Sequence, residues 1–193
     1  MDMLLAGLIV FLGVHSTRVF AERFRARWVA RIGEKAWKGA YAIVSIAGFF
    51  LLVWGYGLAR QSPVVLWTPP RGMNHLAALL TLVSFVMLAA AYVPGNGIKA
   101  LLKHPMVLAV KVWAFAHLLS NGTLADMVMF GAFLAWAVLV FRASRQRDRA
   151  QGTVYAPGTA SRTWITIVAG VGAWVAFAFW GHARLIGVSP LGV

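Results

Sequence analysis

The chain has 193 residues, of which 61% are hydrophobic and only 12% are charged, and its mean hydropathy is +0.76. About a quarter of the residues of a water-soluble domain are charged, so this composition excludes a soluble globular protein. The formal net charge is +13 and there is no cysteine, which excludes disulfides, thiolate metal ligands and iron–sulfur clusters.

Six apolar stretches follow one another along the chain, with short loops between them. A helix needs about 20 apolar residues to cross the hydrocarbon of a bilayer, so six such helices leave no room for a soluble domain. We therefore expect an all-α, polytopic membrane helix bundle that forms one domain over residues 1–193. The expected spans are residues 3–20, 37–59, 75–93, 105–119, 124–141 and 164–180.

Lysine and arginine are concentrated in alternate connections between these stretches. The connections after the first, third and fifth stretches hold fourteen of them, whereas the others and the C-terminal tail hold only Arg60, Arg71 and Arg184. This is the positive-inside pattern, and it predicts that both termini lie outside, in the periplasm of a bacterium. We expect a multi-pass protein of the bacterial inner membrane, whose basic residues face anionic lipid headgroups and not nucleic acid.

The residue pattern of three further segments predicts where each of them lies or packs. In the first basic connection, Phe24, Trp28 and Ile32 alternate with arginines at near-helical spacing, which is typical of an amphipathic helix on the headgroups. The polar segment 142–163 reads as an exposed cytoplasmic loop. The sixth stretch contains small residues that favour close helix contact, namely Ala169, Gly170, Gly172 and Ala173.

The candidates for chemistry are histidines. The five carboxylates lie in loops or at the ends of stretches, so no buried acid pair is predicted. His15 lies inside the first stretch and His117 inside the fourth, while the remaining histidines lie at the ends of stretches. An ionisable side chain within hydrocarbon is costly and usually faces a partner, so a functional role is its default interpretation. The histidines at the ends are His75, His104 and His182.

Two neutral imidazoles on different helices are a common way to hold haem b, and the surrounding Trp, Phe and Leu suit the faces of a porphyrin. Zinc would lack ligands to complete its shell. The alternative is that each histidine simply hydrogen-bonds a neighbouring helix. Counting about 1.5 Å of rise per residue places His15 inward of the midplane and His117 outward, so depth alone pairs His15 with His104 and His117 with His75 or His182.

Lys111 has no acidic residue in its own stretch. It lies seven residues after His104 and therefore on nearly the same helix face. Two interpretations stay open: the side chain snorkels to the cytoplasmic surface, or it meets an anion such as a haem propionate or a lipid phosphate.

Several segments of the sequence resemble a known family of membrane proteins. The segments KHPMVLAVKVWAFAHLLSNG (103–122) and FGAFLAWAVL (130–139) are similar to the signature region of the NnrU family, and the resemblance covers essentially the whole chain. His15-Ser16, Gly33-Glu34 and GHARLIGVSP (181–190) fit the same family. The family is named for a bacterial membrane protein associated with denitrification, and it is similar to the membrane domain of plant zeta-carotene isomerase, which uses haem b.

The resemblance implies site residues. The two haem-ligand histidines of the isomerase match His15 and His117, and a third histidine that is not needed as a ligand matches His104. The isomerase has a cysteine three residues before its second histidine, whereas this chain has Ala114. A thiolate ligand is therefore ruled out here. His104, Lys111 and His182 remain additional candidates for binding the cofactor.

The resemblance implies a role in nitrogen-oxide metabolism, or haem-dependent isomerisation of an apolar polyene, with an apolar or small gaseous substrate. The alternative is a non-catalytic haem-binding or assembly factor, so enzymatic activity is left open. A faint similarity of Lys103-His104-Pro105 to the Arg-His-Pro stretch of membrane isoprenylcysteine and phospholipid methyltransferases lacks the downstream acidic pair that those enzymes need.

Overall fold

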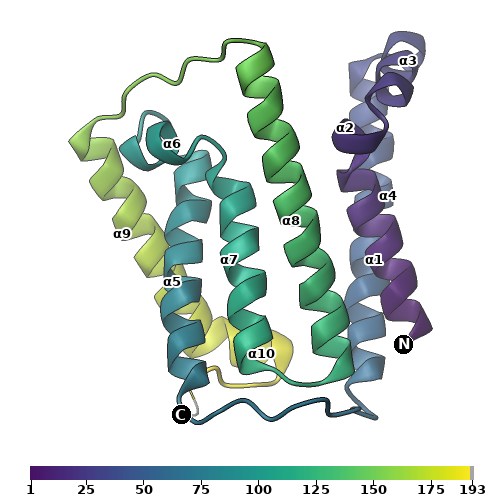
Figure 1. Ribbon diagram of the computed structural model, residues 1–193, viewed down its shortest axis with the longest axis vertical. Coiled ribbons are helices and arrows are strands. Elements are labelled where there is room, and N and C mark those ends of the chain that lie inside the picture. Colours follow the sequence, from purple (N-terminus) through teal and green to yellow (C-terminus); the bar gives the residue numbers. More distant parts are fainter. Residues whose placement is uncertain (192–193) are drawn as a thin grey trace.

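The computed structural model describes residues 1–191, in which all regular secondary structure is helical (Figure 1). The all-α prediction is confirmed. The elements are α1 (Asp2–His15), α2 (Thr17–Phe20), α3 (Glu22–Ile32), α4 (Glu34–Ala59), α5 (Met73–Tyr92), α6 (Gly97–Leu102), α7 (Pro105–Ser120), α8 (Leu124–Ala150), α9 (Ala160–Ala176), the π-helix η1 (Phe177–Gly181) and α10 (His182–Ile186).

Four helical segments are long and apolar enough to cross a membrane: α4, α5, α8 and the continuous run Ala160–Ile186. Helices α1 and α7 are apolar but have 14 and 16 residues, or about 21 and 24 Å of rise, against about 30 Å of hydrocarbon. Large apolar side chains such as Ile43, Phe50 and Val168 are about two-thirds exposed, as expected of side chains that face lipid. The chain is therefore a multi-pass membrane protein, and six crossings remain a prediction.

The helices form two groups. Helix α1 packs along α4 as a pair, which we call the α1–α4 pair, and α8, α7, α5 and α9 follow one another as neighbours in a bundle (Figure 1). Close contact within each group depends on glycine: a Cβ atom on Gly7 would collide with the backbone of Leu52, and one on Gly170 would lie 2.5 Å from the Cα of Val86. The predicted close packing in the sixth stretch is thus confirmed at Gly170, whereas a Cβ on Gly172 would meet open space.

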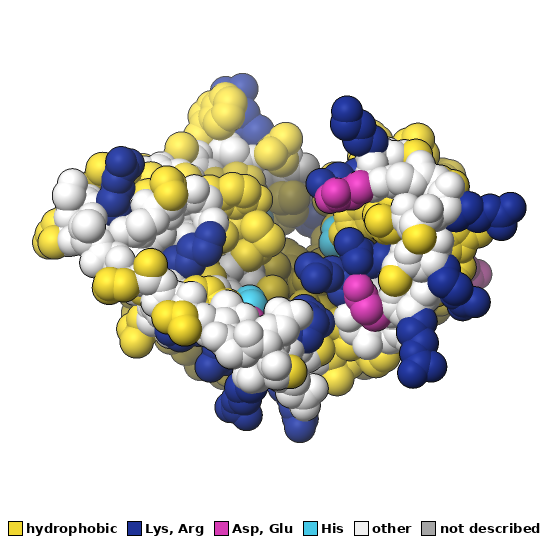
Figure 2. Space-filling model, turned by 90° about the horizontal axis from the view of Figure 1, so that it is seen from above, with side chains coloured by type: hydrophobic (Ala, Val, Ile, Leu, Met, Phe, Trp, Pro, Cys, Tyr) yellow, Lys and Arg dark blue, Asp and Glu magenta, His cyan; other side chains and the backbone are white. Residues whose placement is uncertain are grey.

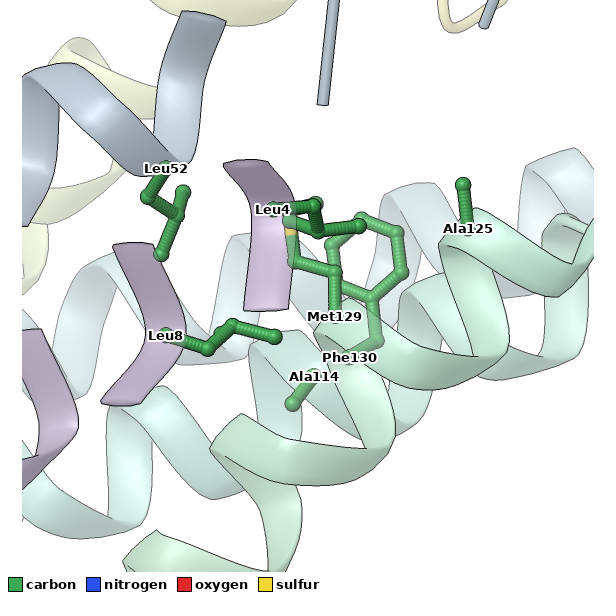
Figure 3. Packing of buried hydrophobic residues seen from close by; sticks show 7 residues of the cluster. All are labelled: Leu4, Leu8, Leu52, Ala114, Ala125, Met129 and Phe130. Carbon is green, nitrogen blue, oxygen red and sulfur yellow. The ribbon is translucent and has the colours of Figure 1, made fainter. Parts of the chain in front are cut away.

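The two groups meet through α8. Leu4, Leu8 and Leu52 of the pair pack against bundle residues in a buried apolar cluster (Figure 3). The connection between α4 and α5 also ties them together, because the backbone amide of Leu66 donates to the carbonyl of Gly122 at 2.8 Å. The bundle residues of the cluster are Ala114, Ala125, Met129 and Phe130.

Two predicted boundaries are wrong. The first stretch was expected to run to residue 20, but α1 ends at His15, where the hydroxyls of Ser16 and Thr17 donate to carbonyls of the last turn. Residues 142–150 were expected to be a loop, but α8 continues to Ala150. Its arginine, glutamine and alanine residues are strong helix formers, and Arg145 pairs with Asp148 one turn later at 3.0 Å.

One end of the molecule carries α2, α3, α6 and the C-terminal end of α8, and we call it the basic end (Figure 1). Lysine and arginine side chains surround it, and a hollow opens there between the α1–α4 pair and the bundle (Figure 2). The N-terminus and the last described residues lie toward the opposite end (Figure 1). Helix α3 has no buried residue, as expected of an amphipathic helix that rests on a surface.

Candidate functional site

His15 is half-buried at the last turn of α1 and faces α4 and α8. Its Nδ1 atom lies 2.7 Å from the carbonyl oxygen of Phe11, so this nitrogen carries the proton and donates it. The Nε2 atom is left with a free lone pair. The centroid of the imidazole lies 4.3 Å from that of the Phe11 ring, 5.3 Å from Tyr41 and 6.3 Å from Trp136.

His117 repeats this arrangement in the last turns of α7. Its Nδ1 lies 2.8 Å from the carbonyl oxygen of Trp113, which again leaves Nε2 free. The half-buried imidazole stacks on the ring of Phe130, with centroids 4.5 Å apart, and lies 5.0 Å from the ring of Trp113. Two small buried residues that precede it, Ala114 and Ala116, allow α7 to approach its neighbours closely.

A continuous row of aromatic rings joins the two histidines. Phe11 lies 6.0 Å from Phe133, and Phe133 lies 5.5 Å from Trp113, so the rings of His15, Phe11, Phe133, Trp113 and His117 are successive neighbours. We call this set the aromatic row. It crosses from the α1–α4 pair through α8 to α7.

The two histidines lie at different depths. Their α8 neighbours, Trp136 and Phe130, are six residues apart, which corresponds to about 9 Å along the helix. His15 lies nearer the basic end, as counting along the sequence predicted. A planar macrocycle bound by both imidazoles would take the place of part of the aromatic row, so its entry requires the rings of Phe11 and Phe133 to separate.

The residues present fit haem b in ligand type, in tautomer and in their apolar surroundings. Within residues 1–191, no group of three or more His, Cys, Asp or Glu side chains is placed to hold a metal ion. What the chain offers is a pair of single imidazoles. The indole Nε1 of Trp136, beside His15, is also buried without a hydrogen-bond partner.

His104 lies elsewhere, at the basic end, and does not join the aromatic row. Its Nε2 lies 2.9 Å from Asp148 Oδ2, which also accepts hydrogen bonds from Tyr155 at 3.1 Å and from Arg145 at 3.0 Å. The preceding residue, Lys103, has φ +70°, and the His104 amide donates to the carbonyl two residues back, a strained three-residue turn. The cluster fastens the segment after α8 to the start of α7.

The charges of this cluster shift two ionisations. Burial acts to raise the pKa of the Asp148 carboxyl, but the hydrogen bonds from His104 and Tyr155 and the attraction of the neighbouring cations outweigh it, so the pKa lies below its ordinary value. Burial, and then the hydrogen bond donated to Asp148, raises the pKa of the Tyr155 phenol. The carboxylate and the neutral phenol are therefore the forms that hold the cluster together.

The other candidates lie outside the aromatic row, and His182 is near enough to His117 for charges on the two imidazoles to interact. Lys111 is half-buried on α7 and forms no ion pair with any residue between 1 and 191. His182 follows the π-helix η1, and its Nδ1 lies 2.7 Å from the carbonyl oxygen of Val188, so its Nε2 is free as well. His75 is exposed.

Sequence reasoning missed a polar contact that fixes α4 to α8. Asp126 is only 5% exposed, and its Oδ1 accepts a hydrogen bond from the Tyr56 hydroxyl at 2.5 Å. Its Oδ2 accepts from the Thr123 hydroxyl at 2.6 Å and from the Thr123 amide at 3.1 Å. The threonine and the acid three residues later are a readable capping box, whereas nothing in the sequence indicates the tyrosine.

A comparison with protein families gives one finding. The family model described as NnrU protein matches residues 3–190, which is nearly the whole chain and includes both half-buried histidines of the aromatic row. No curated protein and no solved structure matches the chain.

Proposed function

This chain belongs to the NnrU family, and we propose that it is a membrane protein that binds haem b through His15 and His117. One observation carries the proposal: two half-buried imidazoles on separate helices each use Nδ1–H on a carbonyl of their own helix and keep Nε2 free. An imidazole that ligates a metal almost always makes this second hydrogen bond, because it fixes the tautomer and the orientation of the ring.

The chain's own residues supply the rest of such a site. The hydrogen bonds to Phe11 and Trp113 fix the tautomer and the orientation of the two imidazole rings. The aromatic and aliphatic side chains around the two imidazoles make their surroundings apolar. Haem b, when bound, supplies an iron that changes between ferric and ferrous states and can take a small ligand when one position is free. Because Ala114 stands where the isomerase has a cysteine, this chain would hold haem b through His15 and His117 and not through a thiolate.

We propose an apolar or small gaseous substrate, in keeping with a nitrogen-oxide-linked role or the isomerisation of a polyene. The surroundings of both imidazoles are aromatic and aliphatic, so they favour a ligand that partitions into the bilayer over a charged one from water.

A second candidate function is a non-catalytic haem-binding or assembly factor. It is favoured by the two carboxylates of α8, because both already have hydrogen-bond partners. Asp126 is held by Tyr56 and Thr123, and Asp148 by His104, Tyr155 and Arg145. Neither is free to act as a general acid or base at the aromatic row.

The test is an absorption spectrum of protein purified from haem-replete cells. We expect a b-type Soret band that disappears in His15→Ala and in His117→Ala. His104→Ala is the matched control, because its imidazole is engaged by Asp148, and it should keep the band. Wild-type protein that is colourless and takes up no added haem would contradict the proposal.

Carbon monoxide then separates the two functions. Binding of carbon monoxide to the reduced wild-type protein would show that one imidazole leaves the iron and that a substrate position opens, as an enzyme requires. A reduced spectrum that carbon monoxide leaves unchanged would indicate a closed site with two permanent ligands, and would favour the non-catalytic factor.

A further inference from the structure

The buried indole N–H of Trp136 lacks a hydrogen-bond acceptor in the part of the chain that the structure describes. Its indole Nε1 is the one buried side-chain polar atom within residues 1–191 that has no hydrogen-bond partner. Buried polar groups are almost always satisfied, because burial removes water without replacing it. An indole N–H can only donate, so what is missing is an acceptor.

The position of this donor relates it to the proposed site. The Trp136 ring stands edge-on to the imidazole of His15, with an angle of 83° between the rings and 6.3 Å between their centroids. The ring of Tyr41 in α4 also packs against this imidazole, with 5.3 Å between the centroids. The residues around His15 therefore come from α1, α4 and α8, and the hollow between the α1–α4 pair and the bundle opens on the basic end, to which His15 is the nearer of the two histidines (Figure 2).

The acceptor is not a carboxylate of the chain. At the basic end, each carboxylate already has partners: Glu22 pairs with Arg18 and Arg25, Glu34 with Lys38, and Asp148 with His104, Tyr155 and Arg145. What this end offers instead is an excess of positive charge, with four arginines on the last turns of α8 alone. These are Arg142, Arg145, Arg147 and Arg149. Such a field stabilises an anionic acceptor that enters from outside.

We propose that Trp136 Nε1–H donates a hydrogen bond to a propionate carboxylate of the haem held by His15, and so orients the macrocycle with its propionate edge toward the basic end. This rests on the proposed function. The two propionates are the polar groups on the rim of haem b, and a hydrogen bond to a carboxylate is stronger than one to a neutral oxygen. A tryptophan at this place satisfies a buried donor and fixes one of the orientations that two imidazoles alone leave equivalent.

The experiment compares haem b with its dimethyl ester, in which both propionates are blocked. Both are titrated into detergent-solubilised, haem-free protein, and Kd is read from the Soret band. We expect Trp136→Phe to weaken haem b binding about tenfold or more, since a hydrogen bond to a charged group is lost, and to leave binding of the ester unchanged. Trp164→Phe, at a position that is 66% exposed, is the matched control and should behave as wild type.

The outcomes separate the two proposals. Wild-type protein that binds neither compound contradicts the proposed function and this inference with it. Wild-type protein that binds haem b, while Trp136→Phe binds both compounds as wild type does, overturns this inference alone. If Trp136→Phe does not fold, as judged by circular dichroism, the wild type is titrated at high salt, which screens the field of the arginines. A preference of about tenfold for haem b over the ester that persists there supports the hydrogen bond to a propionate, and equal affinities overturn it.

Discussion

The contact between Tyr56 and Asp126 yields the sharpest prediction about stability. Asp126→Ala removes the acceptor of three hydrogen bonds at a position that is 5% exposed. The Tyr56 hydroxyl is left without its partner, and such a buried donor costs about 1–3 kcal/mol. The capping box of α8 is lost as well, at about 0.5–2 kcal/mol. We therefore expect the free energy of unfolding to fall by about 1.5–5 kcal/mol.

The assay is unfolding in mixed micelles, followed by circular dichroism as the fraction of denaturing detergent rises. Thr159→Ala is a matched control, because Thr159 caps α9 with a single hydrogen bond to the amide of Arg162 at an exposed site. Its cost should not exceed about 1 kcal/mol. A double-mutant cycle isolates the long-range bond: Tyr56→Phe should destabilise the wild type but not the Asp126→Ala background. An Asp126→Ala protein no less stable than Thr159→Ala would refute the reasoning.

Three further predictions follow from the fold. Gly55→Val should push α1 away from α4 and destabilise the protein by about 1–3 kcal/mol or more in the same unfolding assay, because a Cβ there collides with the α1 backbone; wild-type stability would contradict the close contact. The loops that contain Gln61 and Gln151 are expected on opposite sides of the membrane, and the sequence has no cysteine of its own. An impermeant maleimide applied to intact cells should therefore label Gln61→Cys but not Gln151→Cys. Equal labelling would contradict the topology. The pKa of Tyr155 is raised in the folded protein, so its hydrogen bond to Asp148 stabilises the fold below pH 10 and is lost as pH rises through the folded pKa. An absorbance titration of the wild type, with Tyr155→Phe as the reference, should show ionisation of this phenol above pH 10. Ionisation at or below pH 10 would contradict the raised pKa.

Much of the fold was predictable because hydropathy and charge act along the chain. Every predicted apolar stretch is helical, and the basic connections gather at one end. The errors came from local chemistry that overrides a hydropathy window. At Ser16 the α-helical hydrogen-bond pattern changes, because its amide bonds to the carbonyl of Gly13 three residues back, so α1 ends there. Side chains that favour helix carry α8 through an arginine-rich segment that hydropathy assigns to a loop.

The candidate site was predictable only in part, because tertiary contacts decide it. His15 and His117 were selected as intramembrane histidines, and their offset in depth agrees with counting residues. The aromatic row depends on how α1, α7 and α8 are rotated, and no spacing in the sequence encodes that rotation. The lack of a hydrogen-bond partner for Trp136 Nε1 is likewise a property of packing, since nothing in the sequence distinguishes Trp136 from the eight other tryptophans.

The most direct measurement of the central claim is the electron paramagnetic resonance spectrum of the ferric, haem-loaded protein. If the imidazoles at positions 15 and 117 ligate one iron, the wild type gives a low-spin signal, because two nitrogen ligands impose a strong field. His15→Ala and His117→Ala should each lose the low-spin signal together with the bound haem. A high-spin wild type, or a low-spin signal that survives the loss of either histidine, would contradict the account.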